Sequence, residues 1–194
     1  RGLAMKVFPL SPGGAAEAEI PLLGEAFGLV VADRTPWPRF GIKGPGAADW
    51  LTGAGFALPA PNRIATLPGM AALRLGGNDV TILGDPAFPA PLAALRGRWE
   101  GASGPKGWSS WREEGWAWLH LSGPALPGVL ARLCAVDLAP ERFGADAIAQ
   151  TRFAHLDAVV IRRDASAEVL FDITASAVCL RDLRAAAMTK GTMP

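Results

Sequence analysis

The sequence predicts an α+β fold made of two pseudo-symmetric halves, each with a strand, a helix and two further strands. Three observations indicate this fold. One strand–turn–helix segment occurs twice, short apolar runs alternate with turn residues, and glycine (23) and proline (17) are dispersed among 194 residues. Dispersed glycine and proline are typical of many short elements joined by turns. We therefore expect antiparallel strands with helices on one face of each half.

The repeated segment carries the strongest signal. Residues 40–51 (FGIKGPGAADWL) resemble residues 119–130 (LHLSGPALPGVL), with Gly-Pro at the same place in both. Proline is tolerated in the first turn of a helix, because its missing N–H would be unpaired there. Apolar residues then recur with helical spacing. The residues expected to be buried are Ala47, Trp50 and Leu51 in the first copy, and Leu126, Val129, Leu130 and Leu133 in the second.

The first half is assigned to residues 39–100, after an extended lead-in over residues 1–38. The lead-in contains a candidate strand at 27–32, and Pro36 and Pro38 exclude a helix around Trp37. Gly53 and Gly55 should end the first helix. Strands are expected at 40–42, 71–75 and 80–83, a hairpin turn at 76–79 and a short helix at 91–98.

The second half is assigned to residues 108–188, with residues 101–107 as the seam and 189–194 as a tail. Residues 39–188 are thus expected to form a single domain. Within the second half, strands are expected at 116–121, 147–153, 158–162 and 168–173, and a closing helix at 175–188 with Leu180, Leu183 and Ala187 on one face.

Composition excludes several classes of function. The net charge is +1 and only 19% of residues are charged, so the chain lacks the clustered basic residues of a nucleic-acid or membrane-surface module. Two cysteines cannot form a disulfide framework or a four-thiolate zinc site. No apolar run is long enough to span a bilayer, and no signal peptide is recognised, so we expect a cytoplasmic protein.

The polar residues predict no catalytic, cofactor-binding or metal-binding site on this chain. His155 and Asp157 could act as base and orienting group in a small hydrolase, but no Gly-x-Ser-x-Gly motif supplies a nucleophile. His120 should share a strand face with the tryptophans before it. Cys134 and Cys179 are expected to be small core residues.

Tryptophan is unusually abundant, with seven residues and no tyrosine. Four of them lie between 108 and 118 and predict a hairpin centred on residues 112–115. They could anchor a protein interface or pack across strands in the core. The interface candidates are Trp37, Trp108, Trp111 and Trp116.

Several short motifs, spaced across residues 37–187, resemble those of a known family. They comprise residues 39–51, 59–63 (PAPNR), 73–77 (LRLGG), 121–124 (LSGP), 136–140 (VDLAP), Phe143, 149–152 (AQTR) and 159–162 (VVIR). Together they resemble the gamma subunit of heterotetrameric sarcosine oxidase.

This resemblance implies a fold like the folate-binding domain of the aminomethyltransferase of the glycine cleavage system. It implies a subunit without a cofactor of its own, assembled with alpha, beta and delta subunits. Those partners are expected to carry FAD, FMN, NAD, zinc and tetrahydrofolate. The complex would oxidise the N-methyl group of sarcosine and pass the one-carbon unit to tetrahydrofolate. Alternatives are a similar subunit of N-methylglutamate dehydrogenase, and a folate-binding one-carbon transferase that acts alone.

The sequence departs from folate-using relatives in two respects. Such proteins need an acidic residue facing the pterin, and only Asp137 and Asp172 lie in suitable regions. The Lys-Gly-Cys-Tyr type of motif found in folate-linked iron–sulfur repair proteins is absent. We therefore expect a scaffold that retained the fold and lost the site, with part of its apolar content committed to an interface.

Overall fold

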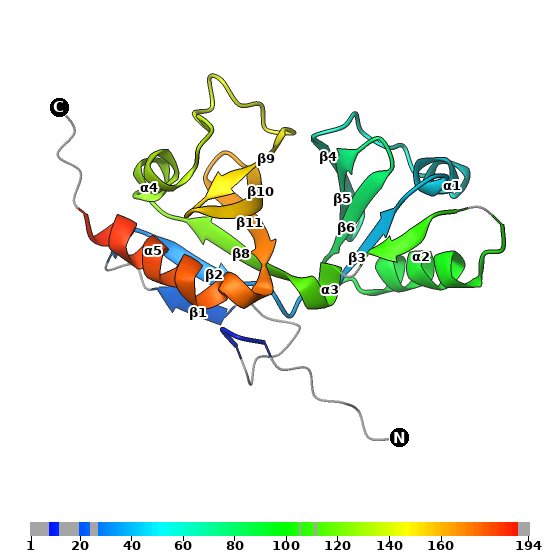
Figure 1. Cartoon of the computed structure of the whole chain (residues 1–194), viewed down its shortest axis with the longest axis horizontal. Coiled ribbons are helices and arrows are strands. Elements are labelled where there is room, and N and C mark those ends of the chain that lie inside the picture. The colour runs from blue at the N-terminus through cyan, green and yellow to red at the C-terminus, as the bar shows by residue number, and fades with distance from the viewer. Residues whose placement is uncertain (1–7, 12–19, 24–26, 105, 111, 190–194) are drawn as a thin grey trace.

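Two antiparallel sheets face each other through the middle of the molecule, and helices cover the outer face of each (Figure 1). The computed structural model describes residues 8–11, 20–23, 27–104, 106–110 and 112–189. The layers therefore run helix, sheet, sheet, helix. The α+β fold class predicted from the sequence is confirmed.

The five-stranded sheet belongs mainly to the first half, with α1 and α2 on its outer side (Figure 1). Its strands, in spatial order, are β4 (Arg63–Leu67), β5 (Met70–Gly76), β6 (Asp79–Gly84), β3 (Arg39–Lys43) and β7 (Trp108–Ser110). The helices are α1 (Ala47–Gly53) and α2 (Ala90–Gly101).

The six-stranded sheet belongs mainly to the second half, with α4 and α5 on its outer side (Figure 1). Its strands, in spatial order, are β1 (Ile20–Leu23), β2 (Val30–Asp33), β8 (Trp116–Ser122), β11 (Ser166–Asp172), β10 (Leu156–Arg162) and β9 (Ile148–Phe153). The helices are α4 (Leu126–Leu133), the 3-10 helix η2 (Ile173–Ala175) and α5 (Ser176–Met188).

The internal repeat is larger than the sequence indicated. In each half a strand is followed by a helix, three strands and a second helix, and the corresponding strands pair in the same order. Within the repeat, the strand missed by the sequence analysis is β4, a short edge strand in which only Ile64 is buried. Gly44 (φ 99°) and Gly123 (φ 107°) occupy the same left-handed position in the two Gly-Pro turns.

The two halves exchange strands where they meet. β2 directly precedes β3 in the chain, yet it pairs with β8 in the other sheet. Reciprocally, β7 precedes β8 but pairs with β3. The hairpin predicted across residues 108–118 is therefore wrong, because its two arms lie in different sheets, joined through the short helix α3 (Arg112–Gly115). Residues 20–33, expected as a lead-in, supply two strands of the six-stranded sheet.

Three apolar clusters fill the spaces between the layers. One lies between the six-stranded sheet and α4 and α5, a second between the five-stranded sheet and α1 and α2, and the third between the two sheets. Of the helical residues expected to be buried, Trp50, Leu133 and Ala187 are only half-buried, because they lie at the edges of these clusters. Within the described ranges, no helix is long and apolar enough to cross a membrane.

Candidate functional site

A buried carboxylate interrupts the apolar layer between the two sheets. Glu168 of β11 has a side chain only 10% exposed. Its Oε1 accepts from Arg34 Nη1 at 2.5 Å and lies 3.0 Å from His120 Nδ1, while its Oε2 accepts from Trp118 Nε1 at 2.5 Å. Burying a carboxylate is tolerable only when its charge and lone pairs are matched in this way.

The strand register brings these groups together. Glu168 is paired directly with His120 across β11 and β8, and Trp118 lies two residues away on the same face of β8. The expected alternation of Trp116, Trp118 and His120 on one strand face is thus consistent with the structure. The signal for Glu168 was a charged residue in the middle of the largely apolar strand SAEVLFD, and it could be recognised only once β8 was known to be its neighbour.

Two tryptophans extend this cluster toward the surface. Trp37 packs edge-on against Trp118, with ring centroids 5.5 Å apart, and the Arg34 guanidinium lies 4.4 Å from the Trp37 ring centroid. Trp37 Nε1 is enclosed and has no hydrogen-bond partner among the described residues. The aromatic and charged groups thus form one connected wall.

That wall borders a cavity of about 450 Å³ between the sheets. Its polar lining residues are Arg34, Thr66, Asp85, Arg163 and Glu168. Its apolar lining comes from both sheets, including Met70 of β5 and Trp118 of β8. The size and mixed lining suit a small ligand, but three donors already occupy the Glu168 carboxylate.

A second buried charge lies where the halves exchange strands. Arg39 is fully buried and donates to five main-chain carbonyls. Two belong to the β2–β3 connection (Thr35 and Trp37), two belong to α3 in the β7–β8 connection (Arg112 and Glu113), and one belongs to Trp116 at the start of β8. Burial lowers the Arg39 pKa from 12.5 to about 10, with nearby carboxylates opposing the shift, so the side chain remains charged at neutral pH. Its role is to join the two connections.

The four tryptophans proposed as interface anchors occupy different environments. Trp108 on β7 is 67% exposed, and Trp111 lies outside the described residues. Trp37 and Trp116 are half-buried against the cluster between the sheets, and Arg112 stacks over the Trp116 ring at 3.9 Å. Trp108 is therefore the one described member of this set that presents most of its surface to solvent.

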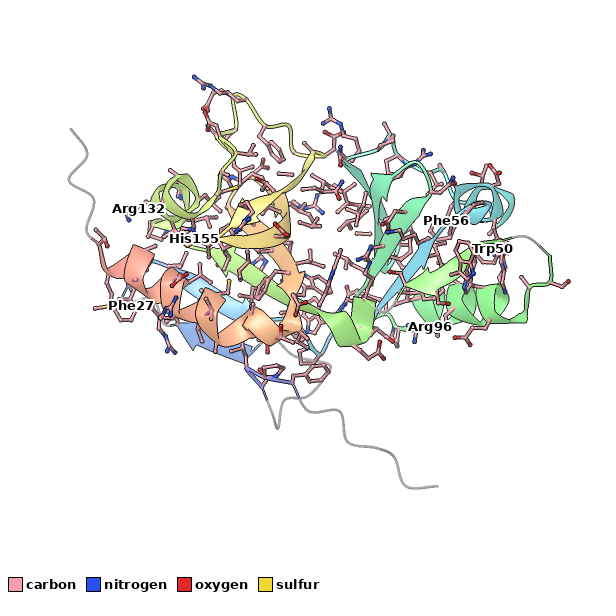
Figure 2. All side chains as sticks on the ribbon, viewed as in Figure 1. Phe27, Trp50, Phe56, Arg96, Arg132 and His155 are labelled. Carbon is pink, nitrogen blue, oxygen red and sulfur yellow. The ribbon has the colours of Figure 1, made fainter. Side chains whose placement is uncertain are left out.

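The residues considered for a hydrolase do not form a catalytic pair. His155 lies in the β9–β10 turn with φ 64°, and its carbonyl accepts from Arg152. Figure 2 shows it in the half that carries α4 and α5, where it and Arg132 line the same shallow depression. The Asp157 side chain is 95% exposed and is paired with Arg152 at 3.6 Å. Within the described chain, no hydrogen bond joins His155 to Asp157.

Neither acidic residue considered for a pterin lines the cavity beside Glu168, although Asp172 lines a separate pocket of about 620 Å³ next to Trp116. Asp137 lies in the loop after α4 and pairs with Arg142 at 3.0 Å. Asp172 caps η2, and hydrogen bonds from the hydroxyl and amide of Thr174 lower its pKa. The acidic residues that line this cavity are Asp85 and Glu168, and sequence reasoning singled out neither.

Burial lowers the reactivity of both cysteine thiols, that of Cys179 more than that of Cys134. Cys179 is fully buried, and burial together with the charge of Asp182 raises its pKa to about 12. Cys134 is half-buried beside the core, and burial raises its pKa. Among the residues that the structure describes, no group of three or more His, Cys, Asp or Glu side chains could hold a metal ion.

Comparison with known proteins shows a likeness of fold. No protein-family model and no curated protein sequence matches the chain. Among solved structures, a chain of the heterotetrameric sarcosine oxidase from Corynebacterium sp. U-96, in complex with pyrrole 2-carboxylate, matches with a TM-score of 0.68 and 22% identity. The match covers 90% of this chain and 91% of that chain. The resemblance found in the sequence motifs is therefore confirmed at the level of the fold.

Proposed function

We propose that this chain is the gamma-type subunit of a heterotetrameric, flavin-dependent amine-oxidising complex of the sarcosine oxidase kind. The observation that carries the proposal is the match of fold over nine-tenths of both chains. The two chains therefore resemble each other over nearly the whole of both. The spaced sequence motifs support the same assignment independently of the structural match.

In this proposal the chain has a structural role, and the chemistry belongs to its partners. The described histidines and cysteines lie apart, and the buried Glu168 and Arg39 are engaged in internal hydrogen bonds. Alpha, beta and delta subunits would carry FAD, FMN, NAD, zinc and tetrahydrofolate. The complex would oxidise the N-methyl group of sarcosine and transfer the one-carbon unit to tetrahydrofolate, in the cytoplasm.

The surface around Trp108 is the best-supported docking position. Trp108 lies on β7, the edge strand of the five-stranded sheet, and is 67% exposed. Its ring packs across Gly44, where an added Cβ would lie 2.2 Å from the ring. The backbone thus holds an exposed indole in a fixed position, and fixed aromatic side chains are typical anchors of protein interfaces.

Co-purification from the native source tests this proposal. A tagged chain should retain a flavoprotein, recognised by its absorbance, together with amine-oxidising activity. Trp108→Glu should abolish this retention, whereas Phe88→Glu, at an equally exposed aromatic residue on another surface, should not. Recovery of the chain alone, without a flavoprotein, contradicts the subunit assignment. Equal retention by both variants contradicts only the docking position.

The amine substrate is tested on the same purified complex. Oxidation of sarcosine, with formation of a methylene-tetrahydrofolate product, supports the sarcosine oxidase assignment. Preferential oxidation of N-methylglutamate assigns the chain to the related dehydrogenase instead.

A folate-binding one-carbon transferase remains the second candidate, with the fold of the folate-binding domain of aminomethyltransferase. The cavity of about 450 Å³ beside Glu168 favours it. The occupied carboxylate opposes it, since a ligand would have to displace Arg34 or Trp118. Calorimetry with tetrahydrofolate at millimolar concentration decides the matter, because an absence of binding removes this candidate.

A further inference from the structure

A groove of about 540 Å³ runs beside α4, on the outer side of the six-stranded sheet. It is separate from the cavity between the sheets and from the Trp108 surface. Its lining is almost entirely aliphatic: Pro127, Leu130, Ala131, Ala135, Val136, Leu138, Ala139 and Pro140. Leu130 and Leu138 form a buried floor, while Ala131 and Val136 are exposed along the groove. Contiguous exposed apolar surface of this kind is typical of a binding site.

One buried cation lies in this aliphatic groove. Arg162, at the end of β10, lines the groove and is only 6% exposed. Its Nη1 donates to the carbonyls of Arg163 and Ser166, the latter at 3.1 Å. Among the described residues, its Nε and Nη2 have no hydrogen-bond partner, and no carboxylate lies within ion-pair distance of it. Both of these nitrogens retain some solvent-accessible surface.

The acidic residue at the groove does not neutralise this charge. Asp137 lines the groove, but its carboxylate pairs with Arg142 at 3.0 Å and also accepts from the Ala139 amide. Its side chain is 52% exposed, which places it in contact with solvent. A buried guanidinium without a counter-ion is costly, and an anion that accepts hydrogen bonds from Nε–H and Nη2–H would relieve that cost.

We propose that this groove binds an aliphatic monocarboxylate, with the carboxylate on Arg162 and the hydrocarbon along α4. Arginine presents two parallel N–H groups that match a carboxylate. The lining contains no aromatic ring on which a planar ligand could stack, so a flexible alkyl body fits its chemistry better. This assignment does not depend on the proposed subunit function, and the groove is a candidate regulatory or carrier site.

Calorimetry with octanoate tests the proposal on the full chain. Octanoate should bind saturably at one site per chain, and neutral 1-octanol should bind roughly ten- to a hundredfold more weakly, because it lacks the charge-assisted pair with Arg162. Equal binding of both ligands overturns the assignment of Arg162 as the anion partner. No saturable binding of octanoate overturns the proposal.

Two variants separate loss of the site from loss of the fold. Ala131→Glu places a carboxylate at an exposed position of the groove and should weaken octanoate binding at least tenfold by charge repulsion and obstruction. Ala94→Glu, at an exposed alanine of α2, is the matched control and should bind normally. Arg162→Met should also lose binding. Unchanged binding by Ala131→Glu contradicts the site.

A thiol in the groove gives a second readout. Cys134 lines the groove, so bound octanoate should slow its alkylation by iodoacetamide. Cys179 lies in the core and should stay unmodified in the folded protein, which makes it an internal control for unfolding. Binding of octanoate without protection of Cys134 would place the ligand elsewhere and overturn the proposal.

Discussion

Replacing Arg39 by methionine should destabilise the protein by roughly 4 kcal/mol. The guanidinium is fully buried and bonds five carbonyls on the two connections that cross between the sheets. Methionine fills much of the same volume without a donor. The substitution therefore removes the hydrogen bonds and leaves the packing nearly intact.

The magnitude follows from two opposing quantities. Hydrogen bonds that involve a charged group contribute about 1.5 kcal/mol each at the low end of their range, so five give roughly 7.5 kcal/mol. Burial, opposed in part by nearby carboxylates, lowers the Arg39 pKa from 12.5 to about 10, and this net shift corresponds to a cost of roughly 3.5 kcal/mol for burying the charged form. The difference, roughly 4 kcal/mol, is a large part of the free energy of unfolding of about 5–15 kcal/mol that is typical of folded domains.

Urea unfolding followed by circular dichroism measures this loss, and thermal unfolding should show a fall in Tm of roughly 8–16 °C. The control is Arg98→Met, which removes an exposed guanidinium with one hydrogen bond, to the Ala54 carbonyl, and should cost less than about 1 kcal/mol. If Arg39→Met costs no more than this control, Arg39 does not hold the two connections together.

Three further predictions concern single residues. At pH 8, iodoacetamide should modify Cys134 slowly and Cys179 only after unfolding, because burial raises the pKa of both thiols, that of Cys179 to about 12. Mass spectrometry after timed labelling measures the two rates, and equal rates would contradict the prediction. The hydrogen bonds that Asp172 accepts lower its pKa below 3.8, so its stabilising effect is complete above the pKa of the unfolded chain and disappears as the pH falls through the pKa of the folded protein. Asp172→Asn should therefore be less stable than wild type at pH 7. Urea unfolding at several pH values should show that this difference vanishes in acid. Gly123→Ala should cost about 2 kcal/mol or more, because φ is 107° and the new Cβ would lie 2.7 Å from a main-chain oxygen, whereas Gly128→Ala in α4 meets no neighbour and should be neutral or stabilising in the same unfolding assay.

The sequence predicted those elements whose signals are local. The Gly-Pro turns, the helices that follow them and the Gly-rich hairpin at 76–79 depend on residues close together in the chain, and all are present. The strand predicted at 27–32 lies at Val30–Asp33. Periodicity also placed Trp118 and His120 on one strand face. These features can be recognised without knowing which distant segments of the chain they contact.

The features that sequence reasoning missed depend on contacts between distant segments. β4 has only one buried residue, so it shows too little alternation of apolar and polar residues to be recognised as a strand without knowledge of its pairing with β5. The tryptophan-rich segment was assigned to one hairpin because its two arms are adjacent in sequence, whereas the β-ladders place them in different sheets. Glu168 was predicted only as part of a strand, because its partners Arg34 and His120 come from distant segments of the chain.

The exchange of strands explains why the buried charges lie where they do. In a chain with two similar halves, β2 could also pair with the neighbouring β3, and apolar packing alone discriminates poorly between similar sheets. Arg39 can satisfy five carbonyls only when both connections cross beside it. Glu168 likewise bonds Arg34, which follows β2, only when β2 lies beside β8. Both charges therefore favour the exchanged pairing, and the same pairing places β7, with its exposed Trp108, at the edge of the five-stranded sheet. On this argument, the docking surface proposed for the partner subunits depends on polar groups buried well away from it.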